Sequence, residues 1–217
     1  MMLSKKEVLE IIRLLEEAYP EPLCALEYER DYELLFAARL AAQCTDARVN
    51  TVTPTLFRRY PDLESIASAD IGELEEIIHS CGFYRVKARD IVSAASMLIG
   101  RFNSRVPDTM EELLELPGVG RKTANLMLGD IHKKPAVVVD THCIRLSNRI
   151  GLVKTKNPEK IETELRAMLP PDKSSDFCHR LVLHGRAVCV ARSPACDRCC
   201  IAKICKKIIF VVQARKL

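Results

Sequence analysis

The stretch LPGVGRKTAN (residues 116–125) combines a proline, two glycines and a lysine where one helical pattern ends and another begins. Because Gly118 and Gly120 have no Cβ, the backbone here can come close to another molecule. The amides at the start of the second helix lack intrahelical acceptors, so they can hold a phosphate and grip a DNA backbone without distinguishing bases. A plain turn between two helices is the alternative, but the complete LPGVGRKTA run favours the DNA contact.

Lys122 follows this turn and has two interpretations. In the first turn of a helix, beside Arg121, the helix dipole and the neighbouring cation oppose its positive charge, and partial burial would favour the neutral amine further. A neutral lysine amine can attack the C1′ atom of a sugar and form a Schiff base. An exposed lysine that pairs with a phosphate is the alternative, and the residues around Lys122 leave both open.

Asp140 is a candidate partner for this lysine. It follows the apolar run at residues 136–139 and precedes an amphipathic helix, so capping of that helix would explain it. A carboxylate partly buried behind that run could instead stabilise positive charge on a sugar as a base leaves, or help to take the proton from Lys122. The pairing with a hairpin lysine favours the catalytic interpretation.

Four cysteines form a compact array in CVARSPACDRCCIAKIC (residues 189–205). Zinc sites are usually built from two CxxC-like pairs, whereas four unevenly spaced thiolates in one loop favour an iron–sulfur cluster. Zinc is the second alternative, and disulfides are the third because we expect a reducing compartment. Cys200 could replace Cys199 in another register, and we favour Cys199. The expected ligands are therefore Cys189, Cys196, Cys199 and Cys205.

The composition of the 217 residues is that of an ordinary globular protein, with 48% apolar and 29% charged residues. No apolar run reaches the ~18–20 residues of a membrane span. The first residues, MMLSKKEVLEII, lack the features of a signal peptide, so we expect a cytoplasmic, nucleoid-associated protein. We expect the remaining cysteines to be small buried apolar residues: Cys24, Cys44, Cys81, Cys143, Cys178 and Cys200.

The net charge is only +4, but residues 180–217 contain nine basic residues against one acid. This local excess favours a polyanion such as nucleic acid as a partner. A solvated basic face is the alternative, and the overlap with the cysteine array makes it the weaker one.

The elements that must position these residues follow a helical period throughout. Ser4 and Glu7 form a capping-box pattern before the first helix, and Asp70 is a plausible N-cap. The one strand-like run, residues 136–139, has no second strand to pair with, so we expect a buried extended connector and an all-α fold. Helices are expected at about 31–43, 46–59, 70–80, 85–101, 109–116, 121–131, 141–150, 157–169 and 174–188.

The motifs LPGVGRKTAN, VDTH and LHGR and the cysteine array, in this order, resemble the endonuclease III family over about residues 5–206. The resemblance implies a bifunctional DNA glycosylase/AP lyase of base excision repair, which excises oxidised pyrimidines from duplex DNA through a lysine Schiff base and nicks the strand by β-elimination. It also implies two helical domains with a DNA-binding cleft between them. One is a six-helix barrel at 23–134 with the helix–hairpin–helix at about 109–131; the other, 1–22 plus 135–217, holds a [4Fe–4S] cluster.

Carried over residue by residue, the resemblance makes Lys122 the nucleophile and Asp140 the catalytic aspartate. Gln43 matches a glutamine that fills the gap left by a flipped nucleotide. Phe83 stands where the family commonly has a leucine wedge, which leaves the opposite-base preference open. The implied DNA contacts are Gln43, Phe83, Gly118, Gly120, Arg121, Thr141, His142, Arg186 and Arg192.

Two other classes of protein are weighed against this one. Monofunctional glycosylases of the same superfamily lack a lysine at the hairpin position. A non-enzymatic iron–sulfur DNA-binding or redox-sensing protein would need neither Lys122 nor Asp140. We expect a monomer that acts on double-stranded DNA containing damaged pyrimidines or abasic sites, without a membrane and with a structural cluster.

Overall fold

The computed structural model describes residues 3–207, and this part of the chain is helical throughout and contains no β-strand, so the all-α prediction is confirmed. The tail IIFVVQARKL, with Arg215 and Lys216 of the basic count, lies outside the described residues. The α-helices are α1 (Lys5–Ala18), α2 (Asp31–Leu40), α3 (Asp46–Arg59), α4 (Leu63–Ala67), α5 (Ile71–Ile78), α6 (Tyr84–Phe102), α7 (Met110–Glu115), α8 (Arg121–Asp130), α9 (Thr141–Ile150), α10 (Pro158–Met168) and α11 (Ser174–Ala187). Short 3-10 helices are η1 (His79–Cys81), η2 (Pro171–Lys173) and η3 (Cys196–Arg198).

The chain divides into two compact units. One is Cys24–Lys134, called the hairpin unit below. The other joins Met1–Leu23 to Pro135–Leu217, with residues 3–23 and 135–207 described, and is called the cysteine unit. The division lies within one residue of the expected boundaries. Among the described residues, no helix has both the length and the apolar character needed to cross a membrane.

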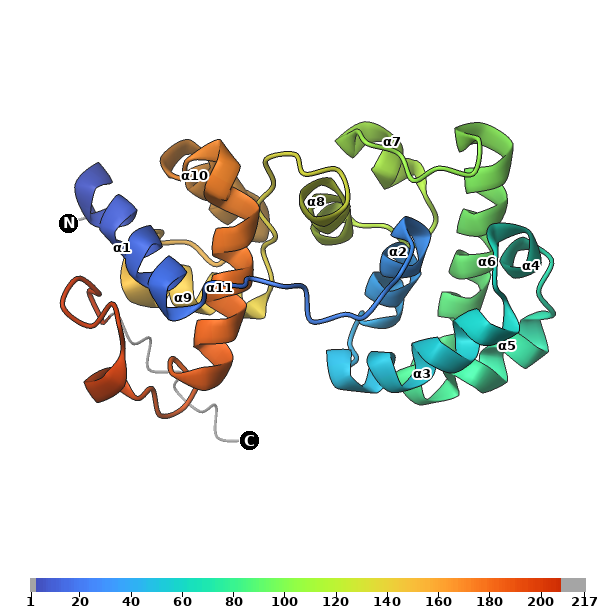
Figure 1. Cartoon of the computed structure of the whole chain (residues 1–217), viewed down its shortest axis with the longest axis horizontal. Helices are drawn as coiled ribbons and strands as arrows, with labels where there is room; N and C mark the ends of the chain where they lie inside the picture. The colour runs from blue at the N-terminus through green and yellow to red at the C-terminus, as the bar shows by residue number, and fades with distance from the viewer. Residues whose placement is uncertain (1–2, 208–217) are drawn as a thin grey trace. The chain divides into compact units, whose positions relative to one another are not determined.

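The hairpin unit is built around α6 and α2 (Figure 1). Helices α4 and α5 pack against α6, while α2 packs against α3, α6 and α8. Its core is mainly aliphatic, and burial of such side chains is the main stabilising term. Helix α8, which carries Lys122, therefore rests on α2 and α7 rather than on a loop.

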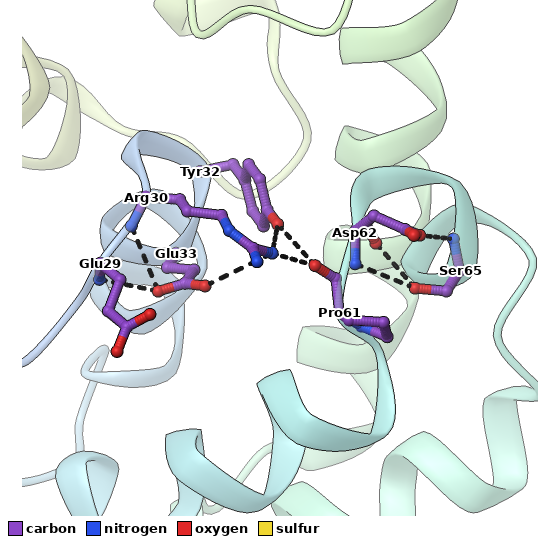
Figure 2. A network of polar contacts seen from close by, with 7 residues as sticks. All are labelled: Glu29, Arg30, Tyr32, Glu33, Pro61, Asp62 and Ser65. Atoms are coloured by element: carbon purple, nitrogen blue, oxygen red, sulfur yellow. Dashed lines mark hydrogen bonds and ion pairs between the residues drawn. The ribbon is translucent and has the colours of Figure 1, made fainter.

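A polar network joins the start of α2 to the turn after α3 (Figure 2). The Glu33 carboxylate, only 5% exposed, accepts the Arg30 amide at 3.3 Å and so satisfies one of the first amides at this helix end. The Arg30 guanidinium donates to the Tyr32 hydroxyl at 2.6 Å and to the Pro61 carbonyl, which also accepts from the Tyr32 hydroxyl at 3.1 Å. The start of α2 and the turn after α3 are thus joined by hydrogen bonds to a backbone carbonyl.

Helix α4 has no counterpart among the sequence predictions. It is a five-residue helix capped reciprocally by Asp62 and Ser65, whose amide donates to Asp62 Oδ1 at 2.8 Å (Figure 2). So short a helix shows no repeating apolar period, and isolated helices of this length are unstable without packing. Buried Leu63 and Ile66 hold it against α6.

The cysteine unit is centred on α11, with α1 and α9 packed against it (Figure 1). The predicted capping box is present at the start of α1, where Ser4 and Glu7 cap each other. Residues 136–138 are buried and belong to no helix or strand, so a buried connector before α9 is confirmed over these residues. The segment from 188 to 207 has little regular structure beyond η3, and side chains from α9 and α11 fix its course.

Candidate active site and cysteine pocket

The predicted hairpin is present between α7 and α8. Thr109 caps α7 through the Glu112 amide, and the turn closes with the Val119 amide donating to the Leu116 carbonyl at 3.1 Å. Helix α8 begins at Arg121, so Lys122 is its second residue. The helix–hairpin–helix thus lies wholly within the hairpin unit.

Gly118 is required by the fold of this turn. Its φ is +75°, a conformation that side-chain-bearing residues rarely adopt. A Cβ at Gly118 would lie 2.5 Å from Arg39 Nε and 2.8 Å from Asp90 Oδ2. Arg39 and Asp90 form an ion pair with 2.6 Å between Nη2 and Oδ2, so the hairpin sits directly on a fixed, half-buried ion pair.

Gly120 has a different role. Its φ is −103°, and a Cβ there would meet open space. The fold therefore does not require glycine at this position, whereas the close approach of another backbone would. Gly120 also brings no capping side chain to α8, which leaves the amides of Lys122 and Thr123 facing an uncapped helix start.

Lys122 is exposed at this helix start. The partial burial that we expected for Lys122 is therefore absent. Arg121, the first residue of α8, is also exposed.

Gln43 and Phe83 share an unusual combination of exposure and backbone conformation. Gln43 lies in the turn between α2 and α3 with φ +56°, and Phe83 directly precedes α6 with φ +47°. Left-handed conformations of this kind cost about 1–3 kcal/mol each and cluster at functional sites. Phe83 is also 67% exposed, so its ring stands in solvent rather than in the core.

Asp140 is the N-cap of α9, because its Oδ1 accepts the Cys143 amide at 2.7 Å. The capping interpretation is thus confirmed, and it leaves the catalytic interpretation open. Asp140 is half-buried and Thr141 is exposed. His142 Nδ1 lies 3.2 Å from Arg145 Nη2, so its ring is held against the first turns of α9.

The four predicted cysteine ligands line one pocket, which encloses roughly 440 Å³ of space between atoms, including space open to solvent. Cys200 is exposed and does not line it, which supports the register with Cys199. All ten cysteines are free thiols. The expectation of buried apolar cysteines is confirmed for Cys81, Cys143 and Cys178 and wrong for Cys200.

Comparison with known proteins decides the family. The HhH-GPD superfamily of base excision DNA repair proteins matches residues 36–171. Endonuclease III of Synechocystis sp. is 48% identical over 206 residues, which cover 94% of each chain. The chain belongs to the endonuclease III family. It is an enzyme of the DNA glycosylase and AP lyase class.

Other members of the family agree with this assignment. Endonuclease III of Escherichia coli is 36% identical over 94% of this chain and 97% of its own. A solved structure of a trapped endonuclease III–DNA covalent intermediate superposes with a TM-score of 0.89 at 38% identity, over 95% of this chain and 97% of that one. A thermostable thymine-DNA glycosylase, at 22% identity and a TM-score of 0.83, shares the fold.

The cysteine pocket of this endonuclease III family member suits an iron–sulfur cluster by its donors. Four thiols face an otherwise largely apolar wall, and burial raises the pKa of Cys199 to about 11 and that of Cys205 above its usual range. Metal binding deprotonates such thiols and thereby couples to folding. Within residues 3–207, no three Cys, His, Asp or Glu side chains converge closely enough to hold a metal ion, so the donors share a pocket without a preformed coordination geometry.

Arg149 of α9 anchors the cysteine segment and was missed by the sequence analysis. Its Nη1 donates to the Val190 carbonyl at 2.9 Å and to Cys189 Sγ at 3.3 Å, and its Nη2 donates to the Ala191 carbonyl at 3.0 Å. Arg149 is 8% exposed, whereas Val190 is half-buried and Ala191 is exposed, so a buried arginine holds a segment that lies nearer the surface. An arginine on the buried, apolar side of an amphipathic helix was the signal that could have revealed it.

Arg145 of α9 joins this helix to α11 and to the segment that follows α11. Its Nη2 donates to the Gly185 carbonyl at 3.0 Å and to the Cys189 carbonyl at 3.2 Å. A Cβ at Gly185 would lie 2.6 Å from His142 Nδ1 and 2.8 Å from Arg145 Nη2, so glycine permits this close packing. The LHGR motif thus links His142 to the cysteine segment.

His184, the histidine of LHGR, lies beside a predicted ligand. Its Nε2 is 3.4 Å from Cys199 Sγ and its Nδ1 is 3.0 Å from the Tyr19 hydroxyl. Burial lowers the pKa of His184, which favours a neutral ring with one donor and one acceptor nitrogen. The Tyr19 hydroxyl therefore holds the His184 ring, and the ring in turn orients the Cys199 thiol.

One of the nine basic residues in 180–217 is buried within the cysteine unit. Arg180 is only 6% exposed, donates from Nε to the Tyr19 carbonyl at 3.1 Å, and lies 3.8 Å from Glu16. Its inclusion in a polyanion-binding surface was therefore wrong. Arg186 and Arg192, in contrast, are exposed, as the DNA-contact prediction requires.

Proposed function

We propose that this endonuclease III family member is a bifunctional DNA glycosylase/AP lyase that excises oxidised or ring-saturated pyrimidines from duplex DNA and nicks the strand. The observation that carries the proposal is Lys122, an exposed lysine in the first turn of α8 directly after the Gly118 and Gly120 turn. A lysine here is what separates a lyase from a glycosylase that uses water alone.

The chemistry assigned to Lys122 has two stages. Its neutral Nζ attacks C1′ of the damaged nucleotide, the C1′–N bond to the base breaks, and the base leaves with the electron pair and takes up a proton. Nζ loses a proton as it bonds to C1′, the C1′–O4′ bond of the sugar ring then opens, O4′ takes up a proton, and C1′ and Nζ form an iminium. The iminium acidifies the C2′ proton, whose removal expels the 3′ oxygen and nicks the strand 3′ to the lesion. The trapped covalent DNA intermediate of a relative 38% identical to this chain supports this course.

Asp140 supplies the negative charge in this scheme. Its carboxylate stabilises the positive charge that develops on the sugar as the base departs, or takes the proton from Lys122. As the N-cap of α9, Asp140 accepts the Cys143 amide, and this hydrogen bond also fixes the carboxylate for its catalytic role.

The remaining predicted residues bind DNA. The uncapped amides of Lys122 and Thr123 hold a phosphate, and Gly120 leaves room for it. Gln43 fills the space of the extruded nucleotide and Phe83 enters between bases, which offsets part of the cost of unstacking. Thr141 and His142 border the damaged base, and further phosphate contacts come from Arg121, Arg186 and Arg192.

The four pocket cysteines, Cys189, Cys196, Cys199 and Cys205, hold a [4Fe–4S] cluster in this proposal. The cluster supplies cross-linking of the 188–207 segment rather than redox chemistry. The basic side chain of Arg192 then stands on a fixed loop. Zinc in the same pocket is the alternative, and iron and sulfide analysis distinguishes the two.

Asp140→Asn separates capping from catalysis. Asparagine caps helices about as well as aspartate, so thermal stability should be unchanged, while release of a ring-saturated pyrimidine from duplex DNA should fall by about 10²–10⁴-fold because the carboxylate charge is gone. Asp140→Ala, the matched control, should also lower the free energy of unfolding by about 1 kcal/mol.

Wild-type activity in that assay decides between the rivals. The proposal expects both base release and a strand nick. Base release without a nick would indicate a monofunctional glycosylase, and DNA binding without either would indicate a non-enzymatic protein. Full activity of Asp140→Asn would reduce Asp140 to a cap.

A further inference from the structure

Lys87 on α6 is a buried cation that the proposed chemistry does not use. Its side chain is 1% exposed, and its Nζ donates to the Leu40 carbonyl at 2.7 Å and to the Cys81 carbonyl at 2.9 Å. Burying an ammonium costs several kcal/mol unless its donors are satisfied. Two backbone carbonyls from different segments satisfy this one, so it joins those segments.

Both carbonyls lie at helix ends. Leu40 is the last residue of α2, and Cys81 is the last residue of η1. Carbonyls at these positions lack intrahelical donors, and the negative end of the α2 dipole favours a cation beside Leu40. Lys87 is therefore a shared C-terminal cap for two elements.

Each capped end leads directly into one of the two strained, exposed residues. Gln43 follows Leu40 by one short turn and has φ +56°, and Phe83 follows Cys81 across Gly82 and has φ +47°. The two turns also influence each other through their thiols, because burial and the neighbouring Cys44 thiol raise the pKa of Cys81 to about 11.

We propose that Lys87 is a positioning residue that fixes the turn of Gln43 and the turn of Phe83 relative to each other, so that both side chains enter the duplex as one unit. The inference rests on the proposed function, in which these two side chains occupy the opened base stack. The ammonium holds both turns at their bases, next to residues whose backbone conformations cost about 1–3 kcal/mol each and revert to ordinary ones when unsupported.

The step that depends on Lys87 is thus opening of the paired duplex, and not the chemistry at Lys122. A lesion that is already unpaired needs no wedge, so its excision should not depend on Lys87. This difference gives a readout that a general loss of stability would not move, because unfolding lowers the rate on both substrates equally.

The test uses Lys87→Met, which keeps length and burial but removes the charge and the donors. Single-turnover nicking is measured on a ring-saturated thymine opposite adenine and on the same lesion opposite a one-nucleotide gap. Rates are normalised to the fraction of protein trapped by borohydride on single-stranded abasic DNA. Lys134→Met is the matched control, since its ammonium also contacts a carbonyl and a carboxylate, those of Asp108, but on the surface of the same unit.

We expect Lys87→Met to lose on the order of tenfold on the paired substrate, the equivalent of about 1.4 kcal/mol, and less than about twofold on the gapped one. Lys134→Met should match wild type on both. Lys87→Arg, which keeps the charge and donors, should give a paired-to-gapped ratio between those of wild type and Lys87→Met, and it provides the same test if Lys87→Met is not recovered folded.

Equal losses of Lys87→Met on the two substrates, or no loss on either, would overturn the positioning role. A wild-type protein that nicks neither substrate and is not trapped on abasic DNA would instead refute the proposed function. The two failures are therefore distinguishable.

Discussion

The hairpin unit carries its candidate DNA-binding residues on short turns between regular helices, and backbone conformation shapes these turns: φ is positive at Gln43, Phe83 and Gly118. The cysteine unit carries its candidate ligands on a segment with little regular structure, and buried side chains from neighbouring helices shape that segment, above all Arg149. Local backbone geometry therefore builds one region, and long-range polar anchoring builds the other.

This difference has a consequence for stability. Turns between packed helices keep their shape as long as the helices do, because the strain in a few residues is carried by the surrounding core. A segment held by arginine–carbonyl bonds and free thiols depends on every anchor, since each buried carbonyl that loses its donor destabilises the fold by about 1–3 kcal/mol. The cysteine unit should thus be the more sensitive to single substitutions and to loss of a bound cluster.

The largest effect is expected at a pocket cysteine. Cys199→Ser should abolish binding of iron and sulfide and make the 188–207 segment protease-sensitive, because structural metal sites contribute on the order of 10 kcal/mol to folding. Cys200→Ser, one residue along and outside the pocket, is the matched control and should retain full iron, sulfide and visible absorbance. If Cys200→Ser loses the cluster and Cys199→Ser keeps it, Cys200 rather than Cys199 is the ligand.

The next largest effect is expected at the arginine anchor. Arg149→Leu leaves the carbonyls of Val190 and Ala191 without this donor, and we expect a loss of about 2–3 kcal/mol in the free energy of unfolding, measured by urea denaturation. Arg192→Leu, in the same segment but exposed, should change it by less than about 0.5 kcal/mol. Similar values for the two variants would show that the segment does not depend on polar anchoring.

A smaller effect, and a sharper division of roles, is expected at the hairpin glycines. Gly118→Ala adds a Cβ at φ +75° against Arg39 and should lower the free energy of unfolding by about 1–3 kcal/mol. Gly120→Ala adds a Cβ in open space and should leave stability within about 0.5 kcal/mol of wild type while weakening binding to duplex DNA. Unchanged DNA affinity of Gly120→Ala would remove the argument for close backbone approach.

The sequence predicted local features of both units. Helix periods, the Ser4 capping box, the Asp70 N-cap and the turn at Gly118 are local signals, and the structure contains them all. The sequence could not show that Gly118 and Gly120 have different roles. The difference depends on Arg39, which lies against Gly118 in the folded chain and not against Gly120.

Long-range contacts account for what the sequence did not reveal. Nothing near Lys87 or Arg149 in the chain indicates that their partners lie 47 and 41 residues away at Leu40 and Val190. Arg180 was misjudged as a surface charge because its burial depends on α1. The sequence favoured Cys199 over Cys200 as a ligand, and the pocket supports that choice because Cys199 lines it and Cys200 does not.

Borohydride trapping on abasic duplex DNA tests the central claim most directly, because reduction fixes a lysine imine as a covalent adduct. Wild-type protein and Lys134→Gln, a control at an exposed lysine of the same unit, should both give the adduct, and Lys122→Gln should give none while still folding and binding the duplex. An adduct that persists in Lys122→Gln would contradict the assignment of Lys122 as the nucleophile.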